Sequence, residues 1–233
     1  MIKKHYHKSS KWFELHRFKL LLLATFLVLI LPAFSGKGPL SNFLFVFTMS
    51  FLFIQSMIVA SSRKRKYAWI RYSVVVIMIG LFIAKPIGLK YVYLDLIRLL
   101  LMVSFFVFIT LYLVKFMRKA PTINLNVIIT SINIYLLTGI IFASLAFLFY
   151  ILFPDAYQFP AYIEKPSFVN FNYYSFITMS TVGYGDITPK LPETQTLAYF
   201  IAVTGQLYVA IVIAFLVGKL LMHKDVEKNK HDA

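Results

Sequence analysis

Residues 168–186, FVNFNYYSFITMSTVGYGD, decide the fold, because they end in a glycine-rich stretch and lie between two long apolar runs. Those runs are Val127–Phe153 and Thr194–Met222. A helix that crosses a bilayer needs about 20 apolar residues, so Phe168–Ser180 is too short and too polar to cross. Such a segment is tolerated at membrane depth only where protein or a water-filled cavity surrounds it. The stretch therefore predicts a re-entrant helix followed by a loop.

The composition of the whole chain is typical of a membrane protein. Hydrophobic residues make up 60% of the chain and charged residues 14%, whereas soluble domains are nearer half apolar and a quarter charged. A backbone exposed to lipid must satisfy its own hydrogen bonds, so we expect each long apolar segment to be a helix. We identify six such segments: Phe18–Phe34, Phe43–Ala60, Ala68–Ala84, Tyr91–Val114, Val127–Phe153 and Thr194–Met222. The predicted fold class is an all-α membrane protein with six transmembrane helices, a re-entrant pore helix and a loop, assembling as a tetramer.

The distribution of basic residues predicts the orientation in the membrane. Most of the 24 Lys and Arg residues fall in one set of loops, within residues 3–19, 63–71, 115–119 and 219–230. Basic loops are retained on the cytoplasmic side, so we expect both termini to be cytoplasmic and residues 154–193 to face outward. The same clustering argues against nucleic acid as the partner of a chain with net charge +15. The first segment also has the basic lead of a signal peptide, but the charge distribution favours its retention.

These segments suggest a division of the chain into four parts. We predict a cytoplasmic N-terminal segment (1–17), a four-helix sensor-like or scaffold domain (18–119), a pore domain (120–223) and a short cytoplasmic tail (224–233).

The loop Thr181-Val182-Gly183-Tyr184-Gly185 has the chemistry of an ion-conducting path. A dehydrated potassium ion needs its water shell replaced, and rings of backbone carbonyl oxygens do this. Aligning the carbonyls needs unusual backbone angles, which Gly183 and Gly185 adopt without steric penalty. The Thr181 hydroxyl can add an inner oxygen.

The run Thr181–Asp186 resembles the TVGYG signature of the potassium channel family, and Ile187-Thr188-Pro189 after it is also similar. The resemblance covers residues 127–222. It implies potassium ions at Thr181, Val182, Gly183 and Tyr184, with Gly185 completing the filter. It further implies support of the filter by Asp186, Tyr173, Tyr174 and Thr178, with Tyr174 and Asp186 forming a hydrogen-bonded aromatic and acid pair.

The last apolar segment carries the expected gate. Gly205 lies where the family often has a hinge glycine, although close helix packing is an equal alternative. Gln206, Val209, Ile213 and Val217 follow on one helical face, which we expect to line the cavity and the lower gate. A polar residue such as Gln206 at membrane depth favours a cavity over lipid.

The fourth segment does not have the charges of a strong voltage sensor. Each charge that crosses the field contributes about 2.3 kcal/mol per 100 mV, and this segment offers only Arg98. Asp95 lies three residues before Arg98 on the expected helix, so the two can simply pair. A weak sensor remnant is the alternative.

The predicted function is passive, potassium-selective conduction that is not strongly voltage-gated. The expected partners are membrane lipid and further copies of the chain in a homotetramer, with no nucleic acid, small-molecule substrate or cofactor apart from potassium ions in the filter. We expect no enzyme, because no nucleophile–base pair or phosphate loop is recognisable. A nonconducting regulatory or structural channel subunit and a potassium transporter are the alternatives. The expected location is the cell membrane of a prokaryote.

Overall fold

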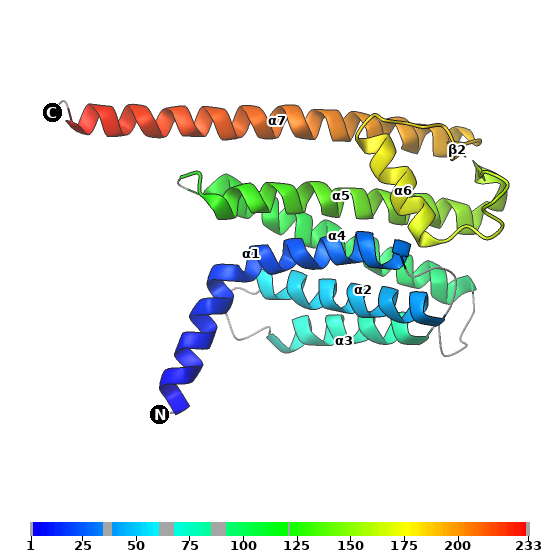
Figure 1. Ribbon diagram of the computed structural model, residues 1–233, viewed down its shortest axis with the longest axis horizontal. Helices are drawn as coiled ribbons and strands as arrows, with labels where there is room; N and C mark the ends of the chain where they lie inside the picture. The colour runs from blue at the N-terminus through cyan, green and yellow to red at the C-terminus, as the bar shows by residue number, and fades with distance from the viewer. Residues whose placement is uncertain (1, 35–38, 61–67, 85–91, 121, 232–233) are drawn as a thin grey trace. The chain divides into compact units, whose positions relative to one another are not determined.

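Seven α-helices make up most of the computed structural model, which describes residues 2–34, 39–60, 68–84, 92–120 and 122–231. In chain order they are α1 (Ile2–Phe34), α2 (Pro39–Ala60), α3 (Ala68–Ala84), α4 (Val92–Lys119), α5 (Leu125–Leu152), α6 (Phe168–Met179) and α7 (Pro192–His231) (Figure 1). Each of the six apolar segments and the re-entrant stretch is therefore helical where the structure describes it, apart from the end residues Phe153 and Ser180. Helices α1 and α7 extend furthest beyond the predicted segments, since α1 begins at Ile2 and α7 continues to His231.

Short non-α elements lie between α5 and α7. A 3₁₀ turn, η2 (Pro154–Ala156), leads into strand β1 (Tyr157–Gln158), which pairs antiparallel with β2 (Thr188–Pro189). Tyr157 lies opposite Pro189, and Gln158 lies opposite Thr188. The chain is all-helical as predicted, apart from this short strand pair, which is too short to leave a periodic pattern in the sequence.

Four helices in the described residues are long and apolar enough to cross a membrane: Phe43–Ala60, Val92–Lys119, Leu125–Leu152 and Pro192–Lys219. A shorter apolar helix covers Ser73–Ile83. These helices are those of a multi-pass membrane protein. Six spans remain a prediction.

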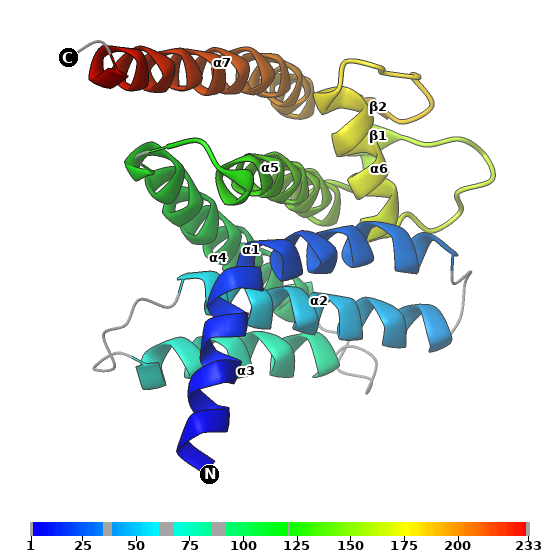
Figure 2. The ribbon, with the colours of Figure 1, turned by 60° about the vertical axis from the view of Figure 1, so that its left-hand side comes forward.

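The chain forms two compact units, Met1–Tyr112 and Leu113–Ala233. In the first unit α2 packs against both α1 and α3 (Figure 2). The fully buried ring of Phe53 on α2 lies 5.4 Å from the Phe82 ring on α3, and 5.3 Å and 5.5 Å from the rings of Phe105 and Phe106 on α4. Aromatic side chains therefore join three helices of this unit.

In the second unit the short helix α6 packs against both α5 and α7 (Figure 2). Helix α5 begins with Asn124 as its N-cap, whose side chain accepts a hydrogen bond of 3.1 Å from the Val127 N–H. The core lies where η2, β1 and α6 meet the ends of α5 and α7. This arrangement holds the loop after α6 against the long last helix.

Part of the basis for the predicted orientation lies outside the described residues. The basic run 63–66 and the lysines at 37, 85 and 90 belong to it. The cytoplasmic location of both termini therefore stays a prediction from the sequence.

Candidate functional site

Helix α6 has a defined start and end. The Ser167 backbone N–H donates to the Asn170 side-chain oxygen at 2.9 Å, which satisfies a group that the first helical turn leaves without a partner. At the other end, the N–H groups of Val182 and Gly183 both donate to the Ile177 carbonyl oxygen, at 2.9 Å and 3.1 Å. The loop after α6 is thus tied directly to the last turn of the helix.

The backbone of this loop alternates in handedness. Thr181, Gly183 and Gly185 have positive φ values of 62°, 50° and 78°, whereas Val182 and Tyr184 do not have positive φ. Such alternation can direct successive N–H groups to one side of a chain, and the N–H groups of Val182 and Gly183 do both reach the Ile177 carbonyl. We expect the carbonyl oxygens to face the opposite side. The sequence predicts unusual angles for the two glycines, and they are present.

Thr181 is held in a conformation that β-branched residues seldom adopt. A positive φ at a non-glycine residue costs on the order of 1–3 kcal/mol. Three contacts hold it: its N–H donates to the Thr178 carbonyl at 3.0 Å, its hydroxyl donates to the Ser180 carbonyl at 2.7 Å, and the Gln206 amide donates to that hydroxyl at 3.3 Å. Two of these contacts come from the end of α6, and the third comes from α7.

The loop is open on its outer side in the single chain. Residues 181–185 are all exposed, with 53% of Val182 and 73% of Tyr184 accessible. Within the described part of the chain no donor is recorded for the carbonyl oxygens of residues 181–184. Carbonyl oxygens are preferred ligands of hard cations, so this row has the chemistry to bind one.

Asp186 follows the loop and is paired with α6. The Tyr173 hydroxyl donates to Asp186 Oδ2 at 2.7 Å. The sequence pointed to Tyr174 as the partner of the acid, and this pairing was wrong. Neighbouring residues on a helix point about 100° apart, so Tyr174 turns away into the core, where it is 2% exposed.

Four buried polar atoms in this region have no partner within the described chain. They are the hydroxyls of Tyr157 and Tyr174, Asn172 Oδ1 and Asp186 Oδ1. The remaining predicted support residue, Thr178, uses its hydroxyl within its own helix, where it donates to the Tyr174 carbonyl at 2.7 Å.

An aromatic cluster packs strand β1 against the buried face of α6. The Tyr157 ring lies edge-on to the rings of Phe171 and Tyr174, at 5.3 Å and 5.4 Å. Burial, and secondarily the neighbouring Tyr174, raises the pKa of the Tyr157 phenol, so it stays neutral. The Ala156 carbonyl accepts hydrogen bonds from the Lys190 N–H and the Thr194 hydroxyl, at 2.9 Å and 3.1 Å. No sequence pattern predicted these contacts of Tyr157 and Ala156, although the density of aromatic residues between 147 and 174 could have indicated an aromatic cluster.

Two glycines allow α5 and α7 to approach α6 closely. A Cβ atom at Gly205 would lie 1.9 Å from the Met179 backbone oxygen, and one at Gly139 would lie 2.4 Å from the Phe176 ring. The Ser175 hydroxyl donates to the Gly139 carbonyl at 2.8 Å. The sequence left two explanations for Gly205, a hinge and close helix packing, and its contact with Met179 favours close packing.

Residues 134–221 match the family model described as ion channel. The match contains α6, the loop 181–185 and most of α7, and it supports ion-channel activity in general terms. Comparison with curated proteins and comparison with solved structures gave no match.

The other predicted residues of the ion channel region lie on α7. Gln206, Val209, Ile213 and Val217 are all exposed in the single chain. Among the described residues no group of three His, Cys, Asp or Glu side chains could hold a metal ion.

Two contacts join α7 to the chain around the start of α5. The Tyr208 hydroxyl donates to the Ser131 carbonyl. The Lys219 ammonium donates to the carbonyl of Ala120, the residue that follows α4. Neither contact could be predicted from the sequence, because each joins residues that are more than seventy positions apart.

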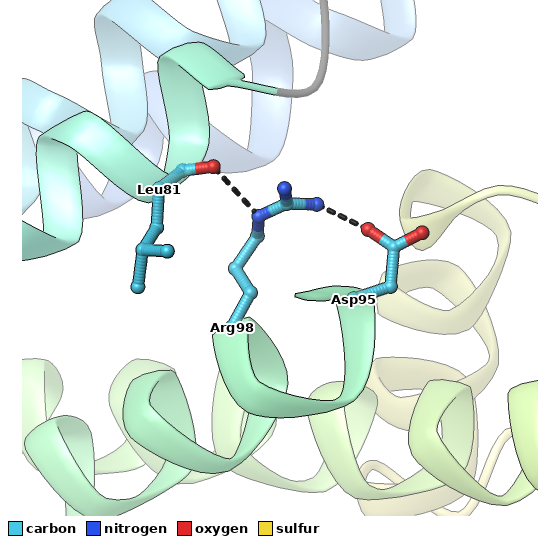
Figure 3. Close-up of polar contacts among 3 residues, drawn as sticks. All are labelled: Leu81, Asp95 and Arg98. Carbon is cyan, nitrogen blue, oxygen red and sulfur yellow. Dashed lines mark hydrogen bonds and ion pairs between the residues drawn. The ribbon is translucent and has the colours of Figure 1, made fainter. Parts of the chain in front are cut away.

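Arg98 in the first unit is buried and engaged on two sides (Figure 3). Its Nε donates to the Leu81 carbonyl at 2.9 Å, and its Nη1 pairs with the Asp95 carboxylate. The Leu81 carbonyl belongs to the last turn of α3, where the helix itself provides no donor. Arg98 therefore caps the end of α3 as well as pairing within α4.

Proposed function

We propose that this chain is the subunit of a potassium-selective ion channel that conducts passively across a cell membrane. The observation that carries the proposal is the alternation of positive φ along residues 181–185, which are all exposed, together with the absence of donors to the carbonyl oxygens of residues 181–184 within the described chain. Rings of carbonyl oxygens replace the hydration shell of potassium in selective filters.

A single chain supplies one side of each such ring, so the proposal requires several copies. Symmetric closure favours a homotetramer. Helix α7 supports this. Only 17% of its most apolar stretch, within Pro192–Lys219, is buried inside the single chain, whereas 44% of the corresponding stretch of α5 is buried. Other copies and lipid would cover the remainder.

The state of Arg98 supports weak dependence on voltage. A gating charge must move through the membrane field, whereas Arg98 is bound to both Leu81 and Asp95. Four such residues that crossed the whole field would supply roughly 9 kcal/mol per 100 mV, and fixed ones supply far less. The six spans, the cytoplasmic termini and a prokaryotic membrane remain part of the proposal.

The test is potassium flux through purified protein in liposomes. We expect flux that is selective for potassium over sodium and is blocked by barium. The variant Gly183→Ala should abolish it: nothing lies within 4 Å of the added methyl, so the change acts through the positive φ alone, at a cost of about 1–2 kcal/mol per subunit.

The matched control is Gly80→Ala, which also places its methyl in open space but at an ordinary helical position in α3. This variant should conduct like the wild type. Absence of flux from a folded oligomer would favour the nonconducting subunit, and flux that survives Gly183→Ala would refute the proposed path.

A further inference from the structure

We propose that Gln206 tunes the cation affinity of the inner end of the carbonyl row, through its hydrogen bond to the Thr181 hydroxyl. The inference rests on the proposed function, because it assigns a role to one residue of the same ion path. Gln206 is a positioning residue in this account, since it acts through Thr181.

The hydroxyl of Thr181 has one hydrogen and two lone pairs. The hydrogen is directed to the Ser180 carbonyl at 2.7 Å. One lone pair accepts the Gln206 Nε2 donor at 3.3 Å. One lone pair is therefore left for a cation, and the amide competes with the cation for the oxygen.

The position of Gln206 follows from the close contact at the residue before it. Gly205 packs on the backbone of Met179, two residues before Thr181, at a separation that leaves no room for a Cβ atom. The side chain of Gln206 therefore begins within reach of Thr181. Among the described residues, Gln206 is the one side chain recorded as a donor to the Thr181 hydroxyl.

The competition predicts a direction. An N–H group carries a positive partial charge, which lies close to the cation when the amide donates to the same oxygen. Removing the amide frees the second lone pair and removes this charge. A potassium ion should then bind more tightly at the inner end and leave more slowly.

The test measures potassium binding to the purified full-length protein in detergent by titration calorimetry in a sodium buffer. Gln206→Met keeps the length of the side chain and removes the donor. We expect the apparent Kd for potassium to fall about two- to tenfold, the range that the loss of one neutral hydrogen bond covers. Leu207→Met is the matched control, because it places the same residue at the next, exposed position of α7, and it should leave the Kd unchanged.

Two backgrounds show whether the effect passes through the hydroxyl. In Thr181→Val, which has no hydroxyl, Gln206→Met should change the Kd less than twofold. In Thr181→Ser, which keeps the hydroxyl, the full shift should return. Gln206→Leu, which also removes the donor and adds no charge, provides a second variant if Gln206→Met does not fold.

The outcomes separate this inference from the proposed function. Saturable binding by the wild type together with an unchanged Kd in Gln206→Met overturns the inference and leaves the proposed function standing. A shift of equal size in Thr181→Val also overturns it, because the effect would not need the hydroxyl. Absence of saturable potassium binding by the wild type overturns both.

Discussion

Replacing Gly205 by alanine adds one methyl group where α7 meets the end of α6. The added carbon would lie 1.9 Å from the Met179 backbone oxygen, while ordinary contact begins at 3.4 Å. The two helices must therefore move apart locally by about 1.5 Å, because the neighbour is a backbone atom and not the end of a flexible side chain. The contact belongs to the same region as the Gln206–Thr181 hydrogen bond, which would lengthen as well.

The cost can be estimated from the behaviour of overpacked interiors. Adding a methyl group to a well-packed site costs about 1–3 kcal/mol. Because the neighbour is a backbone atom, the cost lies at the upper end, about 3 kcal/mol, and the gain of about 0.5–1 kcal/mol from replacing a helical glycine leaves a net loss of about 2 kcal/mol. For a chain of this length each kcal/mol lowers the melting temperature by about 2–4 °C, so we expect a fall of roughly 4–8 °C. Potassium flux should fall together with the stability.

The assay is thermal unfolding of the purified protein in detergent, followed by intrinsic fluorescence, alongside flux in liposomes. Gly80→Ala is the control, because its methyl meets nothing within 4 Å and the loss of a helical glycine is worth about 0.5–1 kcal/mol in favour of the variant. Its melting temperature should stay the same or rise.

The result also separates the two explanations that the sequence leaves open for Gly205. A hinge glycine would change the flux of Gly205→Ala without changing its melting temperature. A melting temperature equal to that of the wild type would therefore refute the packing argument.

Two further predictions concern other contacts of the described chain. Gly139→Ala should destabilise the protein by about 1–3 kcal/mol, because its methyl meets the Phe176 ring at 2.4 Å. Adding Phe176→Leu to the same chain should restore most of the melting temperature. Failure of this second change to do so would contradict the contact. Arg98→Gln should lower stability by about 1.5–3 kcal/mol through loss of the bond to Leu81, without changing the voltage dependence of conduction in bilayer recordings. Arg98→Lys should also lose stability although it keeps the charge, since an ammonium does not reproduce the fork of a guanidinium; a changed slope of the conductance–voltage curve in Arg98→Gln would indicate a sensor instead.

The helices of this chain could be predicted because their signal is local. Long apolar runs bounded by basic or glycine- and proline-containing stretches indicate helices at membrane depth, and each predicted segment is helical where it is described. The ends were less predictable. Helices α1 and α7 run into polar sequence, because helix propensity continues after the apolar run stops.

The partners in the candidate site could not be read from the chain in the same way. The order of residues does not say whether Tyr173 or Tyr174 meets Asp186, since that depends on the rotation of α6 about its axis. The contacts of the Tyr157 ring with Phe171 and Tyr174 depend on the pairing of two-residue strands, which leaves no periodic signal in the sequence. Contacts such as that between Ser175 and the Gly139 carbonyl join helices whose distance in space no pattern specifies.

The sequence by itself determined the composition of the loop at residues 181–185 and the positive φ of its two glycines, because a residue without a Cβ atom adopts that conformation freely. The tertiary structure decided the rest. Thr181 has the same conformation at a steric cost, which hydrogen bonds to Thr178 and Ser180 at the end of α6 help to offset. The close approach of those two helices at Gly205 depends on packing across the chain, so it places Gln206 in a way that no local pattern could predict.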